Sequence, residues 1–306
     1  MIPQICNFED LCLYVYCIVD DIWKGIAHRF VRPGPAPKCS DQELIVMTLI
    51  GESRGWEMET DMLSYWADQR SLFPHLPTQS RFNRRRRALS QAFNLVRQHL
   101  LARLDLTQDR QMVLDSLPIE VMGFHLVPGS ATKADWQSWG ASYGRVQSKK
   151  KTIFGYKLHL LITVSGVIKD FVLASAHEMD LAVGIGLLNE HSNLTVMGDK
   201  AYISARVAEE LRVSNNIRLL SLPRSNQKEQ LLKEVCRIFN SLRQKVETVN
   251  SQLTEQFNIE RNHAYTFWGL CARLYSKLTA HTLFIYINRL LGKADCLHIK
   301  KLAFPI

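Results

Sequence analysis

The sequence predicts an α/β protein in which helices flank a mixed β-sheet, with a helical N-terminal region and a helical C-terminus. Three observations support this prediction. Apolar residues recur at helical spacing in residues 1–105, short apolar strands alternate with helices from about residue 110, and a helical pattern returns near Gln227. Strands that are followed by strand–helix alternation are typical of a sheet covered by helices.

The N-terminal region begins with a helix expected within residues 1–31, which are partly apolar. Three prolines in "RPGPAPKC", residues 32–39, then interrupt the chain. Ser40 and Glu43 have the spacing of a capping box, so a new helix is expected to begin there.

A proline-containing turn, "FPHLPTQ" at 73–79, is expected to precede a helix from about Ser80 to Leu104. "RFNRRRRAL" at 81–89 places five arginines on this helix. Like charges this close together are costly unless an anionic partner neutralises them, which favours a DNA-binding helix-turn-helix over residues 41–104. A solvated helix face is the alternative. The expected DNA contacts here are Arg81, Arg84, Arg85 and Arg87.

The sheet region begins with "QMVLDSLPIEV" at 111–121, a short apolar strand expected to end at Asp115. "KTIFGYKLHLLITVSGVIKDFVLAS" at 151–175 predicts two strands joined at Ser165 and Gly166, a dipeptide typical of turns. The elements expected next are a helix at about 178–190, a strand at 194–199, a helix at 203–212 and a strand at 217–223.

Composition limits the possible partners and compartment. The chain has 306 residues and a formal net charge of +9, which favours an anionic partner such as DNA. Its seven cysteines include no CxxC pair and no zinc-type spacing with histidine, as expected for reduced thiols. Acidic residues precede the first apolar run, and no uncharged stretch of about 20 apolar residues follows. We therefore expect a cytoplasmic protein with no membrane partner.

Three acidic residues stand where ligand-binding side chains are expected. Asp115 and Asp199 each follow a strand, and Glu247 lies on a late helix, four residues after Arg243. Two carboxylates about 4 Å apart repel by roughly 4 kcal/mol at an effective dielectric of 20. A converging trio therefore needs a protonated member or bound divalent cations. Oxygen-only ligands suit two Mg²⁺ or Mn²⁺ ions.

Four ordered motifs resemble those of the DDE transposases of prokaryotic insertion sequences. The Pro-rich segment after residue 31 and the helix-rich C-terminal segment resemble the flanks of one branch of that family. The resemblance covers about residues 30–293. The motifs are "LDS" at 114–116, "GYKLH" at 155–159, "GDKAY" at 198–202 and Arg-x-x-x-Glu at 243–247.

The resemblance implies a ribonuclease-H-like catalytic domain at 106–293, after a helical DNA-binding region at 1–105 and before a tail at 294–306. It also implies an enzyme that binds terminal inverted repeats, cuts the ends of its element by metal-dependent hydrolysis and joins the 3′ ends to target DNA. The expected partner is double-stranded DNA, bound by a homodimer that uses no small-molecule cofactor. The implied catalytic metal ligands are Asp115, Asp199 and Glu247.

The chain departs from the family pattern near the third acid. Relatives often carry Tyr and Lys where this chain has Asn240 and Thr254, so two DNA contacts expected on that helix are not matched. Ala201 stands in "GDKAY" where many relatives have Gly.

Further DNA contacts are expected around the acids. Packing under the sheet is the alternative role for Tyr202, and His159 is expected to be a packed sheet residue. The aromatic residues of "DWQSWGASYG" are expected in a loop folded onto the core, with base stacking as the alternative; they are Trp136, Trp139 and Tyr143. The expected contacts are Lys149, Lys150, Lys157, Lys200, Tyr202 and Arg243.

Other interpretations remain open at this point. Each acid could have a local role, such as capping a turn or a helix, and Glu255 and Glu260 compete with Glu247 as the third acid. A nuclease of the same fold would cut DNA without joining strands. A DNA-binding regulator would keep structural carboxylates and bind DNA without Mg²⁺, and a decayed element copy would be inactive.

Overall fold

The computed structural model describes residues 5–146, 150–199, 202, 204–221 and 233–305. The chain divides into two compact units. Met1–Asp105 and Gln252–Ile306 form the first unit, and Leu106–Ser251 forms the second. The expected catalytic domain extends to residue 293, whereas the residues that follow Ser251 cluster with the N-terminal helices.

The second unit holds the sheet. Its strands are β1 (Gln111–Met122), β2 (Ser142–Val146), β3 (Lys151–Thr163), β4 (Ile168–Ser175), β5 (Thr195–Gly198) and β6 (Arg218–Ser221). Its α-helices are α6 (Lys133–Ser138), α7 (Asp180–Asn189), α8 (Ala205–Asn215) and α9 (Lys233–Ser251). Short 3₁₀ turns occupy Leu106–Gln108 and Phe124–Gly129.

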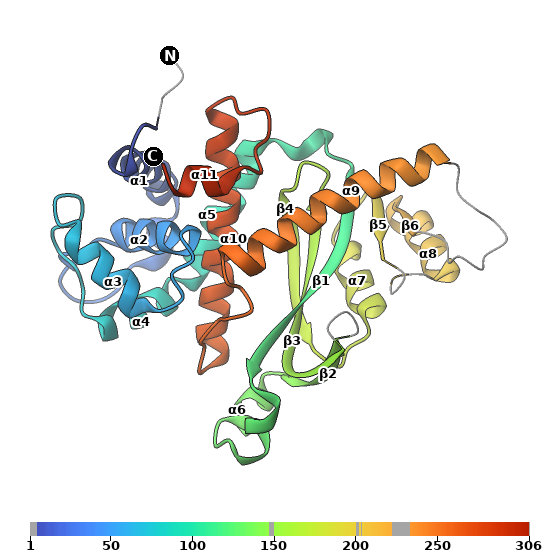
Figure 1. Cartoon of the computed structure of the whole chain (residues 1–306), viewed down its shortest axis with the longest axis horizontal. Coiled ribbons are helices and arrows are strands. Elements are labelled where there is room, and N and C mark those ends of the chain that lie inside the picture. The colour runs from blue at the N-terminus through green and yellow to red at the C-terminus, as the bar shows by residue number, and fades with distance from the viewer. Residues whose placement is uncertain (1–4, 147–149, 200–201, 203, 222–232, 306) are drawn as a thin grey trace. The chain divides into compact units, whose positions relative to one another are not determined.

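The sheet is mixed, with the order β2-β3-β1-β5-β6 and β4 beside β3 (Figure 1). β1 pairs antiparallel with β3 and parallel with β5, which pairs parallel with β6. β2 and β4 pair antiparallel with successive halves of β3. This arrangement confirms the predicted α/β class and is the one expected of a ribonuclease-H-like domain.

Both faces of the sheet are covered by helices. Leu114 of β1 packs in a core cluster with Leu187 of α7 and Leu211 of α8. The preceding residue, Val113, packs with Leu242 of α9. Neighbouring residues of a strand point to opposite faces, so α9 covers the face opposite α7 and α8, and Figure 1 shows it lying across β1.

β1 is longer than the sequence predicts. The strand was expected to end at Asp115, but it continues to Met122 in antiparallel register with β3. Its pairing with β5 ends at Leu114, and no other described strand pairs with that side of β1 beyond this residue. Pro118, which has no N–H to donate, is tolerated because it lies in this one-sided part of the strand.

The first unit is helical. Its helices are α1 (Phe8–Ile26), α2 (Asp41–Ser53), α3 (Glu59–Asp68), α4 (Gln79–Ala88), α5 (Ser90–Leu104), α10 (Phe267–Leu290) and α11 (Ile299–Ala303). Ala27–Phe30 forms a 3₁₀ turn, and Gln252–Gln256 forms a π-helical turn. α10 is buried around most of its circumference and packs against α5 and α2, as expected for the central helix of a bundle.

In the first unit, the sequence correctly predicts the start of α2 but not the break between α4 and α5. The predicted capping box is present, because the Ser40 hydroxyl accepts from the Glu43 N–H at 3.1 Å and the Glu43 carboxylate accepts from the Ser40 N–H. The single helix expected from Ser80 to Leu104 is instead two helices that meet at Leu89. No glycine or proline marks that break in the sequence. Over the described part of the chain, no helix combines the length and apolar character required to cross a bilayer.

Candidate active site

The parallel register of β1 and β5 brings two of the three predicted acids together. The last paired residues of these strands are Leu114 and Gly198, and Asp115 and Asp199 follow them directly. Neighbouring strands lie about 4.8 Å apart, so the two aspartates begin from adjacent backbone positions. The position of Asp115 is therefore set by the point at which β1 stops pairing with β5, because β1 itself continues to Met122.

The carboxylate of Asp115 is half-buried and doubly hydrogen-bonded. Its Oδ1 accepts from the backbone N–H of Ser116 at 2.8 Å, and its Oδ2 accepts from Nδ2 of Asn250 at 2.6 Å. Burial raises the pKa of Asp115, and the negative charge of Asp199 adds to this effect. The two hydrogen bonds and Arg243 oppose the rise in pKa because they favour the ionised form.

Glu247 of α9 faces the same cavity as the two aspartates. The cavity has a volume of about 310 Å³, and Leu242 and Val246 line it on the helix side. Glu247 is 63% exposed and pairs with Arg243, whose Nε lies 3.0 Å from Oε1 of Glu247. Exposed ion pairs of this kind contribute at most about 1 kcal/mol, so Glu247 can exchange Arg243 for another partner at little cost.

The carboxylates of Asp115, Asp199 and Glu247 are the type of ligand that binds divalent cations, although the three groups are too far apart to hold one ion jointly. Among the described residues, no three His, Cys, Asp or Glu side chains are close enough to hold a metal ion jointly. The cavity nevertheless presents three carboxylates, which are the ligands that Mg²⁺ and Mn²⁺ prefer. Burial, and to a smaller extent the charge of Asp199, raises the pKa of Asp115, and a bound divalent cation would favour its ionised form.

Asn250 is a site residue that the sequence did not reveal. It lies three positions after Glu247, which places both on one face of α9. This spacing was the available signal. Glu255 and Glu260, the alternative third acids, both follow Ser251 and belong to the other compact unit.

Tyr202 is a support for the Asp199 turn. Its side chain is 2% exposed, its N–H donates to the Asp199 carbonyl at 3.1 Å, and its hydroxyl lies 3.1 Å from Nδ1 of His159. A Cβ at Gly198 would lie 2.9 Å from Cβ of Tyr202, so only glycine fits before the acid. Of the two roles considered for Tyr202, the structure shows the packed one, and a ring buried to this extent presents no face to DNA.

His159 is fully buried, as predicted, and burial lowers the pKa of its imidazole to about 4. The ring is therefore neutral at physiological pH, and its hydrogen bond to Tyr202 connects β3 to the turn that follows Asp199.

The predicted lysine contacts of this unit have varied surroundings. Lys157 is bound to Asp180, with Nζ 2.7 Å from Oδ1, and also donates to the Glu178 carbonyl. Lys150 is exposed in the turn directly before β3 and has a positive φ of 49°. Lys149 and Lys200 lie outside the described residues.

The arginine run on α4 separates into distinct environments. Arg81, Arg84 and Arg87 are exposed. Arg85 is largely covered, and it donates to the Cys39 carbonyl at 2.8 Å and pairs with Asp41 at 2.6 Å. Arg81, Arg84 and Arg85 border one cavity, whereas Arg87 borders another.

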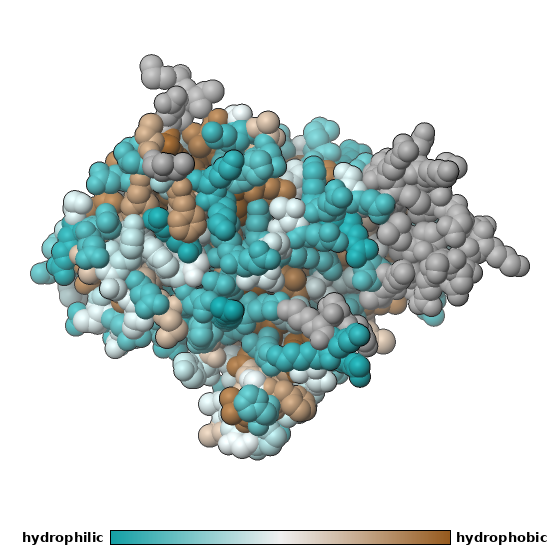
Figure 2. All heavy atoms as spheres, viewed as in Figure 1, coloured by the Kyte–Doolittle hydropathy of each residue, from teal (hydrophilic) through white to brown (hydrophobic). Residues whose placement is uncertain are grey.

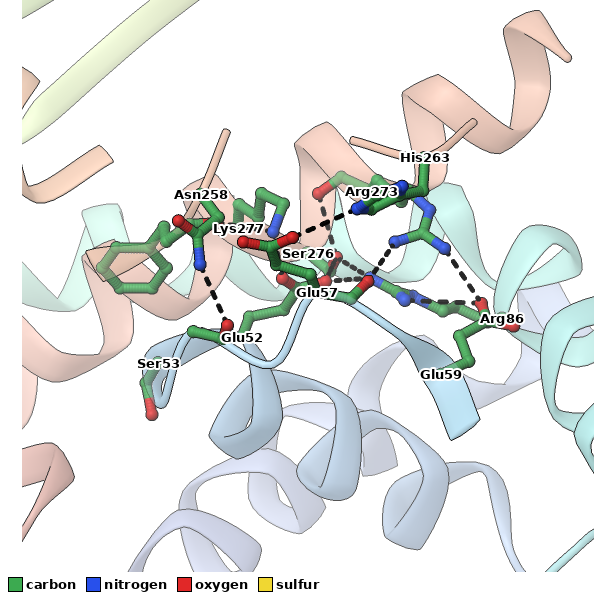
Figure 3. Close-up of polar contacts among 12 residues, drawn as sticks. Glu52, Ser53, Glu57, Glu59, Arg86, Asn258, His263, Arg273, Ser276 and Lys277 are labelled. Carbon is green, nitrogen blue, oxygen red and sulfur yellow. Dashed lines mark hydrogen bonds and ion pairs between the residues drawn. The ribbon is translucent and has the colours of Figure 1, made fainter. Parts of the chain in front are cut away.

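Arg86, the remaining arginine of the run, belongs to a buried ionic cluster (Figure 3). It is 2% exposed and pairs with Glu52 of α2 and Glu59 of α3. Lys277 of α10 binds the other oxygen of Glu52 at 2.5 Å. Burial alone would raise the pKa of Glu52, but Lys277 and Arg86 outweigh burial and hold it below its usual range. The cluster thus joins four helices through ion pairs that the sequence did not predict.

The loop aromatics of the second unit divide between core and surface. Trp136 is 1% exposed and lies on α6, whereas Trp139 and Tyr143 are partly exposed. Tyr143 lies on β2, a strand that the sequence did not predict. Figure 2 shows apolar surface gathered at the tip that carries α6, where Phe124 and Leu126 are also exposed.

Comparison with known families identifies the region that holds these acids. The family model described as "Transposase DDE domain" matches residues 107–283. Comparison with curated proteins and with solved structures gave no match.

Proposed function

The chain belongs to the family of transposases with a DDE domain, and we propose that it cuts the ends of an insertion sequence by metal-dependent hydrolysis and joins the 3′ ends to target DNA. The partners in this proposal are the double-stranded terminal inverted repeats and the target duplex. Two copies of the chain would act together, because two element ends must be joined.

The observation that carries the proposal is the placement of Asp115 and Asp199 after the last residue pair of two adjacent parallel strands. Glu247 enters the same cavity from α9, on the face of the sheet that carries Asp115. Three acids from distant parts of the chain therefore open onto one space. Local capping roles would not require these acids to share a cavity.

In the proposal, Asp115, Asp199 and Glu247 hold two Mg²⁺ or Mn²⁺ ions. When bound, such ions activate an attacking oxygen and stabilise the leaving oxygen of a phosphodiester. The hydrogen bonds from Asn250 and the Ser116 N–H favour the ionised form of Asp115 and fix the direction of its oxygens. Tyr202 and His159 hold the Asp199 turn from below, so that its carboxylate emerges beside Asp115.

Arg243 connects DNA binding to the third acid. It is exposed, lines the cavity and forms an ion pair with Glu247. A backbone phosphate offers the guanidinium a bidentate partner, which would release Glu247 toward the aspartates. Arg243 is therefore proposed as a DNA contact, together with the exposed arginines of α4.

The proposal is tested with duplexes that contain the DNA ends flanking the coding sequence. The wild-type chain is expected to nick these duplexes in Mg²⁺ and to join the 3′ ends to a second duplex. Asp199→Asn should retain end binding and lose nicking by a factor of about 10³ or more, because one metal ligand is removed. Asp135→Asn, an exposed aspartate on α6, is the matched control and should behave as wild type.

Wild-type nicking by Asp199→Asn would remove the site assignment. Nicking without joining would identify a nuclease of the same fold. DNA binding with neither reaction would identify a regulator or an inactive copy.

A further inference from the structure

The first unit contains a basic groove that extends beyond the predicted arginine run of α4. It has a volume of about 620 Å³ and lies among the Pro-rich loop before α2, the loop between α3 and α4, and α4 itself. Its lining residues are Pro37, Lys38, Cys39, Arg70, Pro74, His75, Leu76, Pro77, Arg81, Arg84 and Arg85.

The charges of this groove are of one sign. No acidic side chain is among its lining residues within the described chain. Four of its cations are exposed and form no ion pair or hydrogen bond with any described residue; they are Lys38, Arg70, Arg81 and Arg84. Concentrated, unpaired positive charge in a concave surface attracts a polyanion.

The groove is preorganised by hydrogen bonds and ion pairs among its own walls. Arg85 forms part of its wall and joins two of its segments, because it bonds from α4 to the Cys39 carbonyl and to Asp41. Asp41 also accepts from Arg32, whose Nη2 lies 2.6 Å from Oδ1. Three prolines line the loops and restrict their backbones. Asp41 is thus already neutralised, and the four free cations remain for a partner.

We propose that this groove binds the sugar–phosphate backbone of duplex DNA without reading its sequence. The inference rests on the proposed function, which supplies DNA as the partner. An α-helix that reads base edges in the major groove, which is about 12 Å wide, enters the groove and presents its side chains on a convex surface. Here Arg81 and Arg84 line a concavity instead, which fits a protruding phosphate backbone.

The proposal assigns roles to Lys38 and Arg70, which precede α4 and lie outside the predicted arginine run. Neutralising phosphates releases counterions, so four contacts give a slope of log affinity against log salt of about −3.6. Removing one contact should reduce the slope by about 0.9 and weaken binding about eightfold at 0.1 M salt.

The experiment measures the affinity of the full chain for two duplexes of unrelated sequence over a series of salt concentrations. Arg70→Gln and Arg84→Gln should each lose about eightfold in affinity at 0.1 M salt for both duplexes, with a shallower slope. Arg84→Lys should restore the slope because it restores the charge. Lys301→Gln, an exposed lysine on α11 outside the groove, should leave affinity and slope unchanged.

Affinity and slope that stay at wild-type values in Arg70→Gln and Arg84→Gln would overturn the proposal. A loss confined to one of the two duplexes would also overturn it, since it would indicate base reading. Both outcomes are separate from the proposed function, because nicking in Mg²⁺ by the wild-type chain is scored independently. The groove variants bear no substitution near the acids, so a chain that binds through the groove but never nicks would refute the catalytic proposal alone.

Discussion

Four consecutive arginines on α4 have different roles, and only the structure separates them. Arg86 is buried between Glu52 and Glu59, whereas Arg84 is exposed and unpaired. The sequence places Arg86 near Phe82 on the apolar face of the helix but does not indicate its acidic partners, which lie on two other helices. Helical periodicity predicts which face a residue occupies, and it carries no information about which charge meets it there.

We expect Arg86→Met to lower the free energy of unfolding by about 3–5 kcal/mol, because it removes the guanidinium that Glu52 and Glu59 share and leaves their buried negative charge only partly compensated. Arg84→Met, the matched change two residues earlier on the same helix, should alter the free energy of unfolding by no more than about 0.5 kcal/mol. Urea unfolding of both variants measures the difference. Equal effects would show that the buried cluster is not a source of stability.

A second prediction at this scale concerns pH. His281 of α10 is fully buried, and burial lowers the pKa of its imidazole to about 3. In the unfolded chain His281 becomes protonated as the pH falls through 6.5, whereas in the folded chain it stays neutral until about pH 3. The free energy of unfolding therefore falls as the pH decreases from 6.5 toward 3. This one group should remove about 2 kcal/mol of stability between pH 8 and pH 5.

His281→Gln cannot titrate and should lose about 2 kcal/mol less than the wild type over that interval in urea unfolding. His298→Gln is the control, because His298 is 65% exposed. A pH dependence that is the same in His281→Gln and in the wild type would contradict the assignment.

At the scale of elements, helix α7 contains two glycines in opposite surroundings. A Cβ at Gly186 would meet nothing within 4 Å. A Cβ at Gly184 would lie 2.8 Å from atoms of both Leu114, which precedes Asp115, and Tyr202, which donates to the Asp199 carbonyl. The same substitution therefore has opposite expected effects at two positions one half-turn apart.

We expect Gly186→Ala to raise stability by up to about 1 kcal/mol, because alanine favours the helix. Gly184→Ala should lower stability by about 1–3 kcal/mol through overpacking, and it should also slow nicking because it displaces Tyr202. Thermal unfolding and a nicking assay on both variants provide the measurement. Unchanged nicking by Gly184→Ala would show that the position of Tyr202 does not control the site.

Most elements of the sheet could be predicted from the sequence, and the failures have physical causes. The hairpin of β3 and β4 was predicted from its apolar runs and the turn at Gly166, whose φ of 86° favours glycine. β2 was missed because Ser142–Val146 contains only one aliphatic residue and is held by its pairing with β3. Asp115 was expected at a strand end, whereas the end of its pairing with β5 determines its position.

Only part of the candidate site could be predicted from the sequence. Asp115, Asp199 and Glu247 could be chosen because strand ends and a late helix are detectable patterns. The spacing of Asn250 from Glu247 indicated its helix face but not its bond to Asp115. The groove residues Lys38 and Arg70 could not be chosen, because their role depends on contacts between segments distant in the chain. Polar residues in loops have no periodicity that would indicate such contacts.

At the scale of the whole molecule, each compact unit carries one half of the proposed function. The second unit positions the acids, and the first carries the basic groove and the buried ionic cluster. Residues after Ser251 complete the first unit, and α10 is its central helix. Variants of the groove should therefore change DNA affinity with the acids intact, and variants of the acids should change cleavage with affinity intact.

The most direct test of the account replaces one proposed metal ligand by a ligand of different preference. Mg²⁺ requires oxygen ligands, whereas Mn²⁺ accepts sulfur more readily. We predict that Asp199→Cys binds element-end DNA normally, fails to nick it in Mg²⁺ and regains measurable nicking in Mn²⁺, while Asp135→Cys nicks as wild type in both. Nicking by Asp199→Cys that is the same in the two metals, whether at wild-type rate or absent, would contradict the claim that Asp199 holds the catalytic cation.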